Sequence, residues 1–217
     1  MKVIAKIQNE YTEKFGVPRQ SGRVESTVSK IVFEKEFSSP DAVRGIEGFS
    51  HLWLIFGFDK TGGKYRLTVR PPRLGGNKKV GVFASRSPFR PNSLGLSSVK
   101  LERVEITENG TVLYVSGADL LSGTPIYDIK PYLTFTDCHL DAKNGYAEDF
   151  INYYLAVENT HLLNGLPTET KNKIISALKE DPRPSYHKDG REYGANLFGA
   201  EIKFKVEDKT LYIIKVN

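Results

Sequence analysis

The sequence predicts a mainly β protein, with an antiparallel β-barrel as its N-terminal domain and a small α+β appendage at its C-terminus. Three observations support this. Short segments of alternating apolar residues recur up to about residue 137. Glycine and proline corners separate them, and no long helical pattern precedes about residue 146. Helical spacing appears only later. We therefore divide the chain into a barrel domain, residues 1–137, and an appendage, residues 138–217.

The first elements follow from short apolar patterns. Residues 2–8 alternate and predict a strand, and residues 28–37 are rich in β-branched and aromatic side chains, which predicts a second. Residues 39–41 open a short helical turn that ends near Gly45. Residues 49–58 are almost continuously apolar and predict a strand buried on both faces, with His51 a core histidine bonded to a backbone carbonyl.

A rigid basic loop lies between two further strands. Residues 65–69 pair next, residues 79–84 alternate, and a second alternating segment starts at Leu96. Between them, two prolines in residues 86–92 restrict the backbone around the arginines, so that little entropy is lost when they bind an anion. The apolar phase then changes between Leu101 and Val104, which predicts a bulge.

The remaining elements complete the barrel and build the appendage. Asn109-Gly110 predicts a hairpin turn into a strand over residues 111–116. Helical spacing predicts helices over residues 147–163 and 168–179, and Pro182 ends the second of them. Alternation at residues 202–206 and 211–213 predicts a closing hairpin.

All of the positive charge excess falls in one window. Residues 60–101 hold ten Lys or Arg residues and no Asp or Glu. Outside it, 21 basic residues face 26 acidic ones, a balance of −5 within a chain whose net charge is +5. This concentration favours a surface that binds a polyanion over a general role in solubility.

The composition excludes several classes of protein. Cys138 is the single cysteine, so an intramolecular disulfide and a multi-cysteine metal site are excluded. The four histidines lack the spacing of metal ligands, and we predict no metal. No stretch is long and apolar enough to span a membrane, and the first residues lack the apolar region of a signal peptide. We therefore expect a cytoplasmic protein.

Six motifs in order identify a family. They are VPRQSGR, FSHLWLIF, VRPPRLGG, GVFASRSPFRPNSLGLSSVKL, SGTPIYDIKPYL and DPRPSY. In this order they closely resemble the TsaA-like family, the tRNA adenine-37 N6-methyltransferases of TrmO type. The resemblance covers residues 1–137 densely and the appendage more thinly. It implies an S-adenosylmethionine-binding barrel, a homodimer with active-site parts from both subunits, and N6-threonylcarbamoyladenosine in the anticodon loop of a threonine tRNA as the substrate.

The resemblance also assigns roles to individual residues. It implies cofactor contacts at Gln20, Ser21, Gly22, Arg23, Asp59, Lys60, Arg86, Leu96, Ser116, Gly117, Ala118 and Asp119. The family commonly has His-Gln in place of Asp59-Lys60 and Pro in place of Ser21, so these contacts are expected from backbone atoms or in altered form. A tRNA-facing edge is implied at Asp181, Arg183 and Tyr186.

The chemistry of the reaction points to the catalytic candidates. The exocyclic nitrogen of adenine is a poor nucleophile and must be aligned while its proton is accepted. We assign Asp128 to orient it, and Lys130 and Tyr132, on the same side of a strand, to hold the threonyl carboxylate or the base. Alternatively, Asp128 caps a turn and Tyr132 is a core residue. The substrate set is completed by Arg73, Arg90 and Asn92.

Two other functions compete with this one. A non-catalytic RNA-binding barrel would keep the basic window and lack a cofactor pocket. A methyltransferase of the same fold that acts on a small molecule would not require ten uncompensated basic residues in one window.

Overall fold

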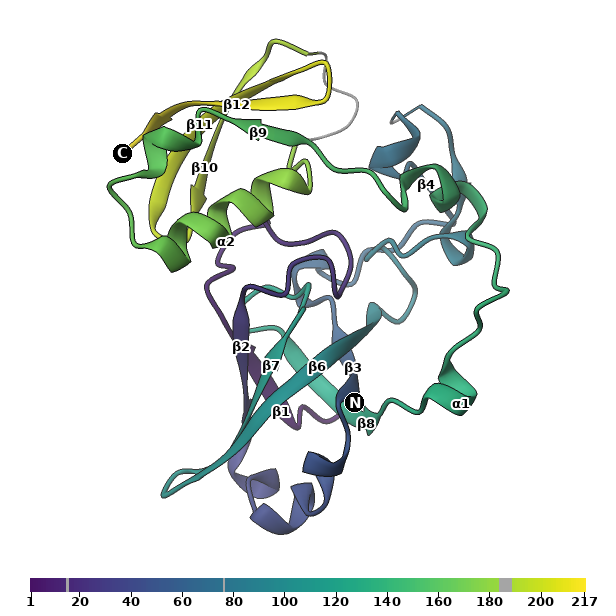
Figure 1. Cartoon of the computed structure of the whole chain (residues 1–217). Helices are drawn as coiled ribbons and strands as arrows, with labels where there is room; N and C mark the ends of the chain where they lie inside the picture. Colours follow the sequence, from purple (N-terminus) through teal and green to yellow (C-terminus); the bar gives the residue numbers. More distant parts are fainter. Residues whose placement is uncertain (15, 76, 184–188) are drawn as a thin grey trace.

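Six antiparallel strands form a closed barrel in the order β1-β2-β7-β6-β3-β8 (Figure 1). The structure, a computed structural model, describes residues 1–14, 16–75, 77–183 and 189–217. Pairing of Ala5 in β1 with Ile126 in β8 closes the barrel. The predicted mainly β fold is confirmed. The barrel strands are β1 Ala5–Gln8, β2 Val28–Phe33, β3 His51–Gly57, β6 Leu94–Thr107, β7 Gly110–Ser116 and β8 Pro125–Pro131.

Alternation places one apolar face of each strand inside the barrel. The side chains of Ile7, Ile31, Leu54, Leu113 and Ile126 are fully buried there, each from a different strand. Burial of such side chains stabilises the fold by about 1.5–3 kcal/mol each. The barrel is therefore a filled core.

The predicted bulge and hairpin turn are confirmed. The β6–β7 pairing shifts register between Leu101 and Arg103, where the apolar phase changes. The same two strands end in a tight turn, with Thr107 paired to Gly110. Ser39 also caps the predicted short turn, since its hydroxyl accepts a hydrogen bond from the backbone N–H of Asp41 (3.3 Å).

Three local predictions were wrong. β3 is buried on one face only, because its outer face forms the wall of a cavity. His51 lies on that outer face and is exposed; its Nδ1 lies 2.9 Å from the hydroxyl of Ser50. The expected strand over residues 79–84 is reduced to β5, Val80–Gly81, and a 3-10 helix, Val82–Ala84, follows it.

The basic window projects from the barrel. We name residues 58–93, which connect β3 to β6, the basic lobe. It pairs β4, Thr68–Val69, with β5 and stands beside the barrel in Figure 1. The lobe also contains 3-10 helices at Asp59–Thr61 and Pro72–Leu74. Its backbone is anchored where the N–H of Phe58 donates to the carbonyl of Ser93 (2.8 Å).

The C-terminal domain is a four-stranded sheet covered by one helix. The helix α2, Thr168–Lys179, has the predicted bounds, and its Ile174 and Leu178 are buried against the sheet core. The expected closing hairpin is confirmed. The strands, in the order β10-β11-β12-β9, are β9 Ala156–Glu158, β10 Glu192–Leu197, β11 Ala200–Glu207 and β12 Thr210–Val216.

The helix predicted over residues 147–163 was wrong. This segment contains a 3-10 helix at Gly145–Phe150, the strand β9, and a second 3-10 helix at Thr160–Leu163. β9 runs parallel to β12, and its partners there replace the hydrogen bonds of a helix. The short α1, Thr134–Asp137, opens the long connection to this domain (Figure 1).

The two domains have separate apolar cores and meet along the chain between β1 and β2. Lys173 of α2 forms an ion pair with Glu10 at 2.7 Å. The rings of Tyr11 and Phe198 lie 5.7 Å apart. None of the helices that the structure describes is long and apolar enough to cross a membrane.

Candidate functional site

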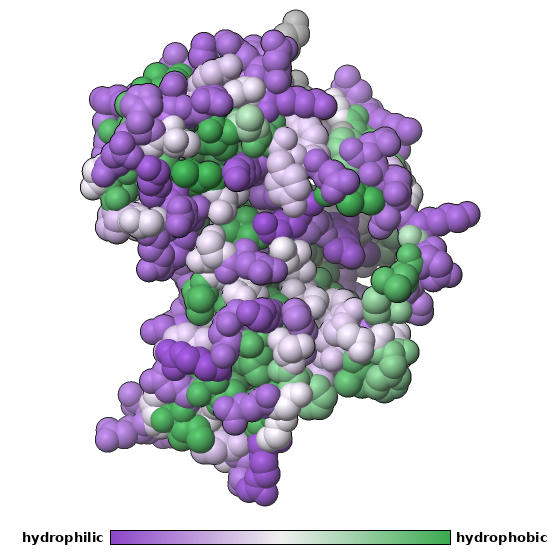
Figure 2. Space-filling model, in the orientation of Figure 1, coloured by the Kyte–Doolittle hydropathy of each residue, from purple (hydrophilic) through white to green (hydrophobic). Residues whose placement is uncertain are grey.

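A cavity of about 1740 Å³ lies where the barrel, the basic lobe and the C-terminal domain meet. Figure 2 shows the surface hollowed at this place. Its walls come from residues 16–21, the outer face of β3, residues 85–90 of the basic lobe, the start of β6, residues 119–121, residues 132–135 and the end of α2. Segments remote in sequence thus form one concave site, large enough for a cofactor and part of a substrate.

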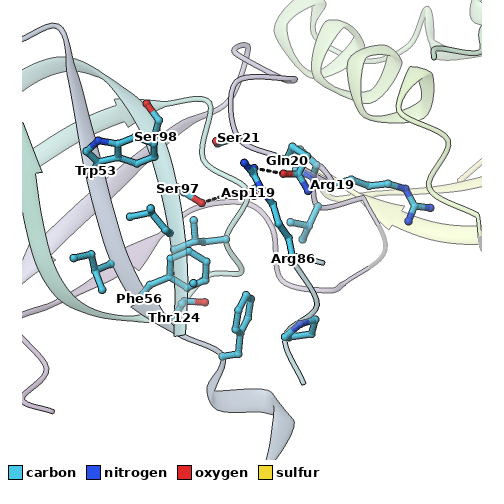
Figure 3. Close-up of a pocket in the computed structure, with 18 of the residues that line it drawn as sticks. Arg19, Gln20, Ser21, Trp53, Phe56, Arg86, Ser97, Ser98, Asp119 and Thr124 are labelled. Atoms are coloured by element: carbon cyan, nitrogen blue, oxygen red, sulfur yellow. Dashed lines mark hydrogen bonds between the residues drawn. The ribbon is translucent and has the colours of Figure 1, made fainter. Parts of the chain in front are cut away.

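One wall presents a guanidinium group. Arg86, at the base of the basic lobe, donates from Nη1 to Oε1 of Gln20, which also lines the cavity (Figure 3). The backbone of Arg86 is held near the rigid proline-containing loop, where Arg90 Nη1 donates to the carbonyl of Ser85 (2.7 Å). The arrangement leaves Arg86 facing the cavity, where it can bind a ligand carboxylate.

A half-buried carboxyl group lies near this guanidinium. Asp119 follows β7 and accepts a hydrogen bond from the hydroxyl of Ser97 on β6 (Figure 3). Burial raises the pKa of Asp119, and the hydrogen bond from Ser97 and the charge of Arg86 offset only part of that effect. A carboxyl with this environment in a cavity is typical of a functional site.

Close contact between two glycines holds the two walls together. The N–H of Gly22 donates to the carbonyl of Gly117 at 2.9 Å. Gly117 has a φ of 75°, and a side chain there would come within 3.3 Å of the Gly22 backbone. Only glycine combines this conformation with this approach.

Aromatic side chains line the outer face of the barrel. The rings of Trp53 on β3 and Tyr132 lie 5.3 Å apart, and both line the cavity. The indole N–H of Trp53 donates to the carboxylate of Asp137 at 2.8 Å, and the N–H of Leu133 donates to the same oxygen. These two bonds lower the pKa of Asp137. The pair forms a fixed platform suited to stacking on a nucleobase.

The catalytic candidates follow the same outer face. In the register of β3 and β8, Asp128 lies opposite Ile55 and Lys130 lies opposite Trp53. Tyr132 lines the cavity, whereas Asp128 and Lys130 lie one strand beyond its wall. One oxygen of Asp128 accepts from the N–H of Ile129 (3.0 Å).

Only part of the predicted cofactor set lines the cavity. The residues that do are Gln20, Ser21, Asp59, Lys60, Arg86, Leu96 and Asp119. Those that do not are Gly22, Arg23, Ser116, Gly117 and Ala118. The hydroxyl of Ser116 donates instead to Glu102 (2.6 Å). The guanidinium of Arg23 points into the C-terminal domain, where its Nε donates to Glu180 at 2.7 Å.

The predicted substrate residues are more dispersed. Arg90 lines the cavity, but its guanidinium binds backbone carbonyls of its own loop. Asn92 is exposed outside the cavity, and Arg73 belongs to a 3-10 helix of the basic lobe. Asp181 and Arg183 are buried, and they pair with each other at 3.0 Å. The candidate Tyr186 lies outside the described residues.

Sequence reasoning missed two residues of the site, Ser97 and Trp53, and the partners of a third, Arg19. Ser97 binds Asp119 only because strands remote in sequence become neighbours. Trp53 was placed on an apolar strand, yet its indole binds Asp137, 84 residues away. It is the single Trp of the chain, and this rarity was the sequence feature that could have marked it as a site residue. Arg19 extends to the domain that begins more than a hundred residues later.

Two family models together match most of the chain. The tRNA-methyltransferase O N-terminal domain matches residues 6–138, and the TrmO C-terminal domain matches residues 156–217. These matches correspond to the barrel with its basic lobe and to the four-stranded sheet with its helix.

Two curated relatives carry a tRNA methyltransferase activity in their names, and a third is named for S-adenosylmethionine binding. A tRNA (adenine(37)-N6)-methyltransferase of Escherichia coli is 42% identical over 216 residues, which cover 94% of this chain and 92% of that protein. One of Eikenella corrodens is 46% identical over 162 residues, 73% of this chain and 92% of that protein. A protein of Archaeoglobus fulgidus named "Probable S-adenosyl-L-methionine-binding protein" is 35% identical over 149 residues, 69% of this chain and 38% of that protein.

Solved structures share the whole fold. The crystal structure of TrmO from Pseudomonas aeruginosa superposes with a TM-score of 0.75 at 31% identity, covering 100% of this chain and 98% of that one. A further crystal structure of TrmO gives a TM-score of 0.76 at 31% identity and the same coverage. The chain therefore belongs to the TrmO family, the S-adenosylmethionine-dependent tRNA (adenine(37)-N6)-methyltransferases.

Proposed function

We propose that this enzyme methylates N6 of N6-threonylcarbamoyladenosine at position 37 of threonine tRNA, in the cytoplasm and as a homodimer. One observation carries the proposal: the basic lobe forms one wall of the cavity and the Trp53–Tyr132 platform forms another. The lobe offers cations to phosphates, and the platform offers π-faces to a base. In this proposal residues 1–137 bind the cofactor and residues 138–217 face the tRNA.

The polar groups of the cavity fit S-adenosylmethionine. The bound cofactor supplies an electrophilic methyl group, and it carries a carboxylate, an ammonium group and ribose hydroxyls that need partners. Arg86 is placed to bind the carboxylate, with Gln20 as a neighbour that fixes the guanidinium. Asp119 is placed to accept hydrogen bonds from the ammonium or the hydroxyls. The rings of Phe56 and Phe58, whose centroids lie 5.1 Å apart, add apolar surface.

The outer face of the barrel fits the modified base. N6 carries a carbamoyl group, so its lone pair is delocalised and it reacts as its proton is removed. Asp128 orients the N–H and accepts that proton. Lys130, exposed and opposite Trp53, binds the threonyl carboxylate. Tyr132 holds the plane of the base beside Trp53.

The anticodon loop is a suitable target for this surface. Its bases can be splayed out without opening a duplex. The lobe and its flanks supply the phosphate contacts, and Arg73, Arg90 and Asn92 belong to the lobe. Asp181 and Arg183 are buried, so they shape the edge of the C-terminal domain that faces the tRNA.

Nucleoside analysis tests the reaction and its substrate together. The protein is incubated with labelled S-adenosylmethionine and two tRNA pools, one normal and one lacking the threonylcarbamoyl modification, and the digested nucleosides are analysed by mass spectrometry. We expect N6-methylated threonylcarbamoyladenosine from the normal pool only. Methylation of unmodified adenosine in the second pool would contradict the proposed substrate, and label in neither pool would exclude tRNA.

Exposed apolar side chains near the cavity support the homodimer. Phe135 and Leu96, which both line the cavity, are 86% and 56% exposed in the single chain, and Leu140, further along the chain, is 97% exposed. Phe135 and Leu96 belong to one cavity surface, and large apolar groups exposed on one surface are typical of interfaces. We expect light scattering after size-exclusion chromatography to give twice the chain mass of 24.4 kDa. A Phe135→Glu variant should shift this value towards one chain, and a wild-type monomer at micromolar concentration would contradict the proposal.

A further inference from the structure

One segment of the chain touches both domains. We name residues 16–23 the strap. It runs between the barrel and the C-terminal domain, and its residues 16–21 line the cavity. Arg19 extends towards the C-terminal domain, whereas Gln20 accepts a hydrogen bond from Arg86 (Figure 3). Arg23 also extends towards the C-terminal domain. The two anchors therefore lie on either side of Gln20 and Ser21, which line the cavity.

Arg19 binds two backbone carbonyls of the C-terminal domain. Its Nη2 donates to the oxygen of Asp181 at 2.9 Å and to that of Arg183 at 2.7 Å. The accepting segment is itself fixed, because the carboxylate of Asp181 accepts from the hydroxyl of Tyr153 (2.8 Å) and from Arg183 (3.0 Å). Burial lowers the pKa of Arg19, and the nearby carboxylates oppose that effect. The guanidinium thus joins the strap to a rigid site.

Arg23 makes the second anchor. Besides its ion pair with Glu180, it donates to the carbonyls of Ile151 and Tyr153, each at 3.0 Å. Its guanidinium lies over the ring of Tyr154, 4.3 Å from the centroid. The side chains of Arg23 and Glu180 are 19% and 5% exposed, so solvent screens this pair weakly.

The contacts on the cavity side depend on where the anchors hold the backbone. Gln20 follows Arg19 directly and accepts the hydrogen bond from Arg86. Gly22 precedes Arg23 directly and donates to Gly117, two residues before Asp119. A backbone shift of about 1 Å breaks hydrogen bonds of this kind. Losing an anchor would therefore displace groups that face the cavity.

We propose that Arg19 and Arg23 are positioning residues through which the C-terminal domain fixes the strap, so that this domain sets cofactor affinity through the position of the strap. The proposal rests on the proposed cofactor site at Gln20, Arg86 and Asp119. A fixed strap loses little conformational entropy when the cofactor binds, which is the advantage of a preorganised site. It further predicts that the two domains act on cofactor binding as one unit.

Arg19→Met tests the proposal by calorimetry with S-adenosylmethionine. The partners of Arg19 are neutral carbonyls, so the variant leaves no buried carboxylate without its cation, in contrast to a variant of Arg23. We expect the Kd to rise about tenfold. The matched control is Lys173→Met, which removes the Glu10 ion pair of the same domain interface but does not contact the strap. We expect its Kd to equal that of the wild type.

Two further measurements separate positioning from loss of folding. Arg19→Lys retains N–H donors for the two carbonyls. It should therefore bind S-adenosylmethionine with a Kd between those of the wild type and Arg19→Met, and it serves as the test if Arg19→Met folds poorly. Hydrogen exchange of Arg19→Met should accelerate at the strap amides and leave the barrel strands unchanged. The proposal would be overturned if Arg19→Met bound the cofactor with the Kd of the wild type, or if Lys173→Met lost as much cofactor affinity as Arg19→Met. The Kd comparison needs no tRNA, so it stands or falls separately from the proposed methylation of threonylcarbamoyladenosine.

Discussion

An Arg86→Met variant should bind S-adenosylmethionine about tenfold to a hundredfold more weakly than the wild type. Arg86 faces the cavity, and Gln20 already holds its guanidinium in place. A hydrogen bond to a charged group contributes about 1.5–3 kcal/mol, which corresponds to that range of affinity. Isothermal calorimetry with the purified variant measures the change, and methyl transfer at low cofactor concentration should fall in parallel.

Arg66→Met is the matched control for this variant. Arg66 belongs to the same basic lobe, but its guanidinium lies over the ring of Phe89 and does not line the cavity. We expect its cofactor Kd to remain that of the wild type, while tRNA binding weakens slightly because one cation is lost. Unchanged cofactor binding in Arg86→Met would show that the carboxylate is bound elsewhere.

Asp119→Asn should make the protein more stable at neutral pH and a poorer enzyme. Burial raises the pKa of Asp119 in the folded state above its ordinary value of 3.8. The folded protein therefore binds this proton more tightly than the unfolded chain, and the free energy of unfolding falls as the pH rises from about 3.8 through the raised pKa. The amide of Asn carries no charge, so the free energy of unfolding of the variant no longer falls with pH for this reason. We also expect cofactor affinity to drop at least tenfold.

Urea unfolding between pH 4 and pH 7 measures this effect on stability. Asp137→Asn is the control, because its stability is expected to change in the opposite direction. Hydrogen bonds from Leu133 and Trp53 lower the pKa of Asp137, so its charge stabilises the folded state above the unfolded pKa. Asp137→Asn should therefore be less stable than the wild type at pH 7. If Asp119→Asn shows the same pH dependence as the wild type, the Asp119 carboxylate is not the group that titrates.

Local patterns predicted the parts of the fold that depend on neighbours in sequence. The phase change after Leu101 marks the bulge, and Pro182 marks the end of α2. The helix prediction for residues 147–163 failed because the apolar residues of this segment contact partners that are distant in sequence. Val157 pairs with Leu211 in a parallel strand arrangement that no local pattern reveals. Strand β10 was missed for a similar reason, since its glycine and polar residues weaken the alternation.

The site was predicted less completely because its contacts join distant segments. Gln20, Arg86 and Asp119 were identified through motifs, and the structure brings them to one cavity. Arg23 belongs to the same motif as Gln20, yet its partner Glu180 is 157 residues away, and nothing in the sequence pairs them. A motif marks residues that matter together but does not tell which face of a loop each side chain occupies.

The closed barrel has a consequence for how such an enzyme can diversify. The outer part of the basic lobe, residues 62–81, carries six basic residues and no acidic ones. It is inserted between two barrel strands, β3 and β6, and each of them is hydrogen-bonded to a neighbouring strand on both of its edges. Doubling the length of such a loop costs only about 0.6 kcal/mol. Arg86 and Asp59 lie at its base, outside this outer part. In the proposed site the cofactor binds at Arg86 and Asp59, so exchange of the outer part can give a descendant a different class of substrate while these two contacts are kept.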